Sequence, residues 1–125
     1  NGEIESGKAL GPGDGATVEH VLPKNLPAES PWKNSWPNSS VHRDLVDTIG
    51  NFALLSSALH QKADNLSFDE KRDLYFEQGE PEFALTRDIK DKVAWTPEVT
   101  RNRTEHLSKI MEQAWQLDRA MPILK

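Results

Sequence analysis

A short β-type run near the beginning of the chain reads Ala16-Thr17-Val18-Glu19-His20-Val21-Leu22 and is closed by Pro23. Its β-branched and apolar residues favour an extended strand, and proline ends the strand because it lacks a backbone N–H. A second run, Asn51-Phe52-Ala53-Leu54-Leu55, follows directly after Gly50 and is apolar enough to be buried. The sequence therefore predicts two short strands with a long connection between them.

The connection is expected to be an irregular loop followed by a short helix. Residues 23–38 contain four prolines, and Trp32 and Trp36 between them indicate that this loop packs on the body of the protein. Asn38 or Ser39 caps the helix, and the glycine before the second strand ends it. One face of this helix carries four apolar residues: Val41, Leu45, Val46 and Ile49.

The rest of the chain is predicted to be mainly helical. A polar segment over residues 56–66 leads to a helix over about 67–78, whose Ser-Phe-Asp-Glu start is a capping box. A short helix is expected over 86–92, and Thr96-Pro97-Glu98 is a good start for the longest helix, which reaches about Ala120. That helix has an apolar stripe: Leu107, Ile110, Met111, Ala114, Leu117 and Met121. The fold class is α+β and mostly helical.

Composition narrows the class of protein. A chain of 125 residues forms one domain with a modest core. It has no cysteine, which excludes disulfide scaffolds, thiolate zinc sites and cysteine nucleophiles and favours a reducing cytoplasm. No apolar run approaches the roughly 20 residues of a membrane span, and no segment reads as a signal peptide. The formal net charge of −5 argues against a nucleic-acid partner.

The first residues differ in composition from the rest. Five of the seven glycines fall within residues 1–15, which are expected to be a linker or a mobile loop. Residues 16–125 would then be the folded domain. The chain begins with Asn1 and lacks an initiating methionine, so we expect it to be the C-terminal fragment of a larger protein.

Two of the four histidines stand beside the predicted strands. His20 follows Glu19 at the end of the first strand, and a neutral imidazole beside an acid suits either metal binding or general-base catalysis. Asn51 opens the second strand and His60 stands nine residues further on; each, taken alone, is an ordinary turn or surface residue. The remaining two are interpreted as surface or packing residues: His42 and His106.

Taken together, these residues resemble the HNH nuclease motif, and in particular the C-terminal HNH domain of GmrSD-type modification-dependent restriction enzymes. Such domains look like Glu/Asp-His-x-x-Pro, a Trp-rich loop, Ile-Gly-Asn-x-x-Leu-Leu, and then Asn-Lys-x-Ser-Asn-x-x-Phe-x-x-Lys-x-x-Tyr. The resemblance covers residues 16–120 and rests on these residues: Glu19, His20, Pro23, Trp32, Trp36, Ile49, Gly50, Asn51, Leu54, Leu55, His60, Lys62, Asn65, Phe68, Lys71, Tyr75, Trp95, Arg103 and Trp115. Many relatives have Asn where this chain has His60.

The resemblance implies a ββα-metal core, in which two short antiparallel strands and a helix are embedded in further helices. It implies phosphodiester hydrolysis with one divalent cation, Mg²⁺ or Mn²⁺, held by Glu19 and His60. His20 would be the general base. Asn51 would support it by tying the loop between the strands, so that the catalytic set is His20, Asn51 and His60.

Four residues are candidate DNA contacts under this interpretation: Lys62, Asn65, Arg101 and Arg103. Taken alone, Lys62 is interpreted as a solvated surface lysine, and the two arginines could equally pair with Glu98 and Glu105. The implied partners are DNA, from a phage or chemically modified, and an N-terminal nucleotide-hydrolysing or sensor domain of the same protein. No membrane partner is expected.

Three other interpretations stay open from the sequence. The first is a catalytically silent HNH-like module that binds DNA or a partner domain, and the second is a plain helical interaction domain. The third is an HNH toxin of the bacteriocin type, although such a toxin is more often strongly basic. The net charge of −5 is compatible with the nuclease, because a bound cation adds positive charge where a phosphate must sit and Glu19 is itself a ligand. DNA binding by this domain alone should be weak and salt-sensitive.

Overall fold

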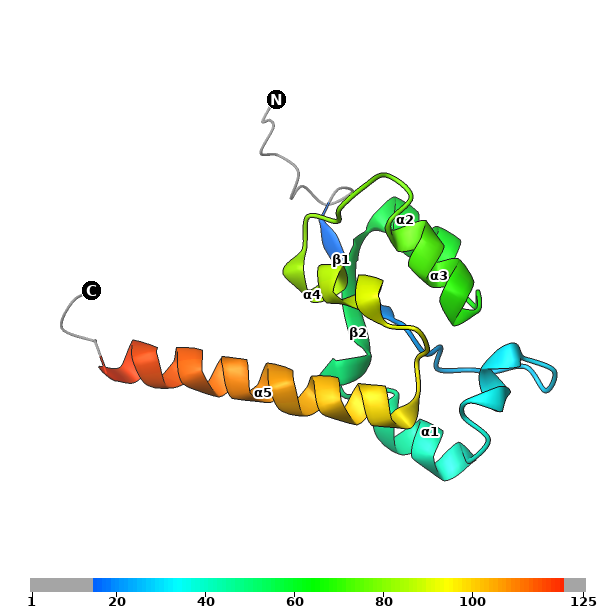
Figure 1. The fold of residues 1–125 in the computed structure, drawn as a ribbon, viewed down its shortest axis with the longest axis horizontal. Helices are drawn as coiled ribbons and strands as arrows, with labels where there is room; N and C mark the ends of the chain where they lie inside the picture. The colour runs from blue at the N-terminus through cyan, green and yellow to red at the C-terminus, as the bar shows by residue number, and fades with distance from the viewer. Residues whose placement is uncertain (1–14, 121–125) are drawn as a thin grey trace.

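The two predicted strands pair with each other. The computed structural model describes residues 15–120, so the expected linker lies almost wholly outside the described residues. Strand β1 (Ala16–His20) and strand β2 (Phe52–Ser56) are antiparallel, with His20 opposite Phe52 (Figure 1). The second strand begins one residue later than expected, because Asn51 belongs to a 3₁₀ turn, η3 (Ile49–Asn51).

Helix α1 (Ser39–Leu45) is shorter than the sequence predicts. Asn38 caps it, and its side-chain oxygen accepts hydrogen bonds from two backbone N–H groups of the first turn. The expectation that Gly50 ends this helix is wrong, because the helix ends at Leu45 and Gly50 lies in η3. Gly50 is needed for a different reason: a Cβ atom at this position would stand 2.1 Å from the carbonyl oxygen of Thr100.

The segment after β2 is mainly helical, and its first helix packs against both strands (Figure 1). Helix α2 (Ser57–Ala63) occupies most of the polar segment, as the ββα resemblance implies. Helix α3 (Phe68–Tyr75) starts with the predicted capping box and ends before the expected Gln78. In place of one helix over residues 86–92, the chain forms helix α4 (Ala84–Arg87) and the 3₁₀ turn η4 (Asp88–Asp91).

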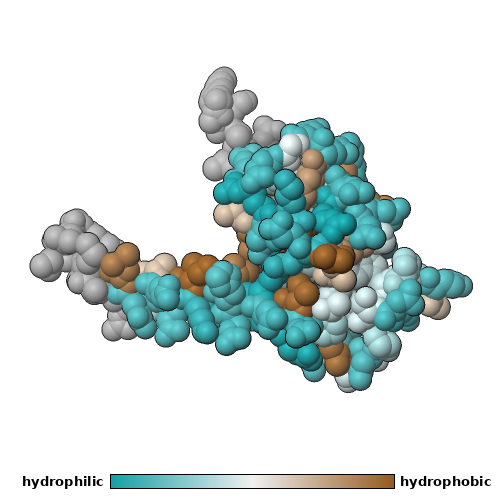
Figure 2. Space-filling view, viewed as in Figure 1, coloured by the Kyte–Doolittle hydropathy of each residue, from teal (hydrophilic) through white to brown (hydrophobic). Residues whose placement is uncertain are grey.

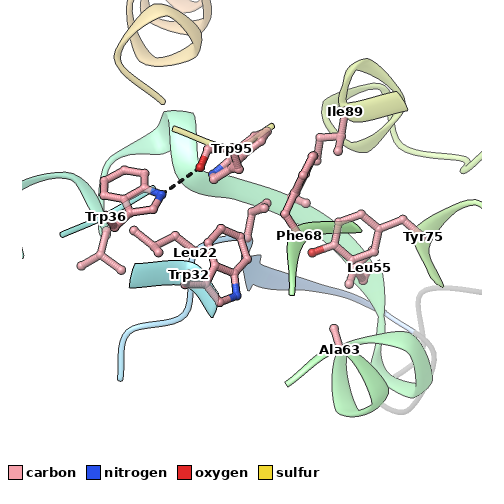
Figure 3. Close-up of a cluster of buried hydrophobic side chains, with 12 residues drawn as sticks. Leu22, Trp32, Trp36, Leu55, Ala63, Phe68, Tyr75, Ile89 and Trp95 are labelled. Atoms are coloured by element: carbon pink, nitrogen blue, oxygen red, sulfur yellow. Dashed lines mark hydrogen bonds between the residues drawn. The ribbon is translucent and has the colours of Figure 1, made fainter. Parts of the chain in front are cut away.

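Buried tryptophans hold the long connection against the rest of the domain (Figure 3). This connection is irregular apart from the 3₁₀ turn η2 (Pro31–Asn34). The Trp36 indole N–H donates to the Trp95 carbonyl over 2.9 Å, and the Trp32 indole N–H donates to the Leu66 carbonyl over 2.8 Å. The expected packing of the loop on the body is therefore confirmed.

The last helix, α5 (Pro97–Ala120), begins where the sequence predicts. Its first turns pack against η3, and its later turns extend away from the body (Figure 1). The predicted apolar stripe is largely exposed there: Ile110, Met111 and Leu117 are 47, 57 and 62% exposed. Met121 lies outside the described residues. No helix within residues 15–120 has the length and apolar content needed to cross a membrane. The structure confirms an α+β, mostly helical fold consistent with a ββα core.

Candidate metal and catalytic site

The end of β1 and helix α2 bring three of the predicted site residues together. Glu19 and His20 are the last two residues of β1, and His60 lies on the helix that follows β2. All three line one hollow of about 250 Å³, which we call the site hollow. Its lining comprises Glu19, His20, Pro23, Lys24, His60, Gln61 and Asp64. Residues about forty positions apart therefore meet because the two strands pair and α2 follows directly.

Glu19 is buried, and its two carboxylate oxygens have different surroundings. Oε2 accepts hydrogen bonds from the Lys71 ammonium and the Tyr75 hydroxyl, both over 2.8 Å. Oε1 lies 3.6 Å from Nε2 of His60. One oxygen is thus held by α3, and the other faces the imidazole.

Lys71 is fully buried and connects α3 to the end of β1. Besides Glu19, its ammonium donates to the backbone carbonyls of His20 and Val21, each over 2.9 Å. Burial lowers the pKa of Lys71, and the Glu19 carboxylate opposes that shift. Burial also raises the pKa of Tyr75 well above its usual range, and Glu19 adds to this rise. All three ammonium hydrogens therefore have partners on the segment that carries Glu19 and His20.

Lys71 and Tyr75 belong to the family pattern, but the sequence did not assign them to the site. A signal was present: with Phe68 they have i, i+3, i+7 spacing, so the lysine and the tyrosine share one face of α3 with an apolar residue. A lysine on a buried helix face needs an acceptor. Here that acceptor is Glu19.

His20 is half-buried, and its ring is held from two sides. Nε2 lies 2.9 Å from Oδ1 of Asp47, and the ring meets Phe52 edge-on at 5.1 Å. The hydrogen bond with His20 is the main cause that lowers the pKa of Asp47. An ionised carboxylate only accepts, so Nε2 carries the hydrogen, and in the neutral imidazole the lone pair is then on Nδ1. Nothing in the sequence marked Asp47, which lies between α1 and η3, as a partner of His20.

Asn51 is fully buried beside the site and does not line the hollow. Its oxygen accepts from the Leu22 N–H over 2.8 Å and from the Trp95 indole over 3.0 Å. Its nitrogen donates to the carbonyls of Leu22 and Val46 over 3.0 and 2.8 Å. These contacts tie down the chain directly after His20, which suits a residue that supports the site without touching substrate.

The four candidate DNA contacts differ in exposure. Lys62, Asn65 and Arg101 are exposed, whereas Arg103 is only 4% exposed. The five N–H groups of Arg103 donate to Asp88, Gly50, Phe52 and Leu85, and its guanidinium lies 5.1 Å from the Trp95 ring centre. The expectation that Arg103 contacts DNA is therefore wrong, because no donor is left for a phosphate. It pairs with Asp88, and neither Glu98 nor Glu105 is its partner.

The geometry of Glu19 and His60 can be tested against a metal ion. Two ligands that each lie about 2.1 Å from one ion are separated by about 3.0 Å at a right angle and by about 3.4 Å in a tetrahedron. The observed 3.6 Å between Oε1 and Nε2 is close to these values. Within residues 15–120 no three His, Asp or Glu side chains form a cage. The pair fits an ion that keeps several positions for water and phosphate, as Mg²⁺ does.

One of three comparisons with known proteins gave a match. A family model described as the C-terminal domain of GmrSD restriction endonucleases matches residues 2–110. Searches of curated proteins and of solved structures gave no match. The match spans most of the chain, and the described residues contain the paired strands and the following helix that the resemblance implies. This chain therefore belongs to the family of C-terminal domains of GmrSD restriction endonucleases.

Proposed function

We propose that this domain is a metal-dependent DNA endonuclease of the HNH type. It would hydrolyse phosphodiester bonds as the effector of a bacterial anti-phage restriction system. The observation that carries the proposal is the meeting of Glu19, His60 and His20 in one hollow. Membership in a family of restriction endonucleases supports DNA as the substrate.

His20 acts as the general base in this proposal. Its Nδ1 takes a proton from a water molecule, and the water oxygen forms a new bond to the phosphorus atom. The bond from phosphorus to the 3′ oxygen breaks, and that oxygen leaves with the electron pair. Asp47 accepts a hydrogen bond from Nε2–H and so keeps the imidazole in the tautomer whose Nδ1 can take the proton.

Glu19 and His60 would hold Mg²⁺ or Mn²⁺, Glu19 through Oε1 and His60 through Nε2. When bound, the cation would supply positive charge that offsets the negative charge growing on the phosphate in the transition state. Lys71 and Tyr75 keep Oε2 occupied, so Glu19 presents one oxygen in a fixed direction. Asn51 holds the chain after His20 in place.

The choice of DNA would belong to another part of the protein. We propose an N-terminal nucleotide-hydrolysing or sensor domain that brings this domain, residues 16–125, to phage or modified DNA in the cytoplasm. The net charge of −5 supports such a division, because an acidic domain has little non-specific affinity for a polyanion. Lys62, Asn65 and Arg101 are exposed and remain proposed DNA contacts.

A plasmid-nicking assay with Mg²⁺, with Mn²⁺ and with EDTA tests the proposal. We expect cleavage with either cation and none with EDTA. His20→Ala should lower the rate by about 10²- to 10⁴-fold, the usual contribution of a general base. His106→Ala is the matched control, because His106 is an exposed histidine on α5 outside the site hollow.

Two results would contradict parts of this mechanism. Cleavage by His20→Ala at the unmodified rate would remove His20 as the base. Titration calorimetry with Mn²⁺ tests the ligands, and Glu19→Ala or His60→Ala variants that bind as tightly as the unmodified chain would remove those residues from the metal site. DNA binding without cleavage under any metal would favour the silent binding module.

A further inference from the structure

A second hollow lies beside the site hollow and has a different charge. It measures about 320 Å³, and we call it the lysine hollow after Lys24 and Lys33. Its full lining is Lys24, Asn25, Leu26, Lys33, Trp36, Pro37, Ser39 and His42. No carboxylate is among these described residues, although the chain as a whole has 20 acidic residues and 15 basic ones. Its volume is within the range of about 300–1,000 Å³ that is usual for small-ligand pockets.

Lys24 joins the two hollows. It lines both of them, and its ammonium lies 3.6 Å from the Asp47 oxygen that is hydrogen-bonded to His20. Its neighbour Pro23 is buried, and the Pro23 carbonyl accepts a hydrogen bond from Nε2 of His42 over 2.8 Å. The lysine hollow therefore adjoins the site hollow that His20 lines.

The second lysine stands on a well-fixed part of the loop. Lys33 lies in η2 between two buried tryptophans, Trp32 and Trp36. The Ser30 hydroxyl caps η2 by accepting from the Trp32 N–H over 3.2 Å. The Trp36 ring meets His42 edge-on at 6.5 Å and forms part of the wall. Lys33 is exposed, but the backbone that carries it is held in place by the buried Trp32 and Trp36 on either side in the sequence.

We propose that the lysine hollow binds a backbone phosphate of the DNA strand next to the phosphate that is cleaved. This inference rests on the proposed nuclease function. Lys24 and Lys33 supply positive charge from two sides, and Asn25 and Ser39 supply hydrogen-bond donors. The hollow contacts phosphate and not base edges, so it sets the position of the strand without reading its sequence.

The test measures DNA binding and cleavage separately. Binding of a fluorescein-labelled duplex is followed by anisotropy in the His20→Ala background with Mg²⁺, at several salt concentrations. Cleavage is followed with His20 intact, and kcat and KM are determined. The variants are Lys33→Gln and, as a matched control, Lys109→Gln, which removes one charge from an exposed lysine on α5.

We expect Lys33→Gln to weaken binding several-fold at low salt and to raise KM while kcat stays unchanged. The slope of log affinity against log salt should become shallower by about 0.9, the value for one lost phosphate contact. Lys24→Gln should lower kcat as well, because Lys24 also contacts Asp47. Lys109→Gln should leave all of these quantities unchanged. If the DNA strand is the ligand, inorganic phosphate at the same concentration as the DNA phosphate should not compete with the duplex for binding.

The inference is overturned if Lys33→Gln and Lys109→Gln bind and cleave alike while the unmodified chain cleaves DNA; the proposed function would then stand without it. If the unmodified chain neither binds nor cleaves DNA under any metal, the proposed function fails and this inference fails with it.

Discussion

Lys71 is a charged side chain without exposed surface. The free energy that its burial costs is offset by its ion pair and hydrogen bonds. Its ammonium contacts Glu19 and the carbonyls of His20 and Val21. Lys71→Met should therefore lower the free energy of unfolding by about 3–5 kcal/mol, because removal of one partner leaves a buried charge uncompensated. Urea denaturation of Lys71→Met measures this loss, and the exposed Lys62→Met is the matched control.

A second variant separates the charge from the packing. Glu19→Gln combined with Lys71→Met removes both charges and keeps a side chain that can accept from Tyr75. We expect the double variant to be more stable than Lys71→Met alone, with a coupling energy of about 0.5–3 kcal/mol between the two positions. Additive losses would show that Glu19 is not the group that holds Lys71.

At the scale of single residues, local pattern predicted more of the candidate site's members than of their partners. Glu19, His20 and His60 could be named because their order and spacing resemble the HNH motif, whereas His60 taken alone would be interpreted as a surface residue. Asp47 could not, because it meets His20 across 27 residues and no local pattern encodes that contact. Arg103 was misjudged for the same reason, since its partners lie on four other elements: η3, β2, α4 and η4.

At the scale of elements, η3 packs closely against α5. The Gly50 N–H donates to the Thr104 hydroxyl over 2.9 Å, and the Gly50 carbonyl accepts from Arg103. A Cβ atom on Gly50 would meet the Thr100 carbonyl oxygen at 2.1 Å and the Thr104 nitrogen at 2.7 Å. Both are backbone atoms of a helix, so neither can move alone.

Gly50→Ala should therefore lower the free energy of unfolding by about 3 kcal/mol, at the upper end of the usual overpacking cost. Gly79→Ala is the control, because Gly79 has a positive φ of 96° and open space around it. That variant should cost only about 1 kcal/mol, from backbone conformation alone. Thermal and urea unfolding measure both. A loss at Gly50 no larger than at Gly79 would contradict the close contact.

The elements themselves were predicted well where local chemistry defines their ends. The capping box at Ser67 and the Thr96-Pro97 start of α5 are local signals, and both hold in the structure. The predicted end of α1 was wrong because Gly50 was interpreted as a helix terminator. Its role is to allow the close approach of α5. That requirement comes from tertiary packing, which a single sequence does not display.

At the scale of the whole molecule, the described domain divides into a packed body and a protruding helix. The body ends near Arg103 on α5, whose guanidinium joins η3, β2 and η4. Figure 2 shows apolar side chains along the later turns of α5, and Ile110 and Met111 are about half exposed. The family model also ends at residue 110. The later turns therefore contribute little to the stability of the body.

Two truncations test this division. A chain that ends at residue 110 should keep the free energy of unfolding of the whole chain to within about 0.5 kcal/mol, the usual effect of a change at exposed positions. A chain that ends at residue 102 should be strongly destabilised, because it lacks Arg103 and leaves the carbonyls of Gly50 and Leu85 without their donor. Urea denaturation of both chains, followed by the fluorescence of the buried tryptophans, measures the difference. If the chain that ends at residue 110 were as strongly destabilised as we expect for the shorter one, the turns after Ile110 would be part of the body. The apolar stripe would then have to act as a core face.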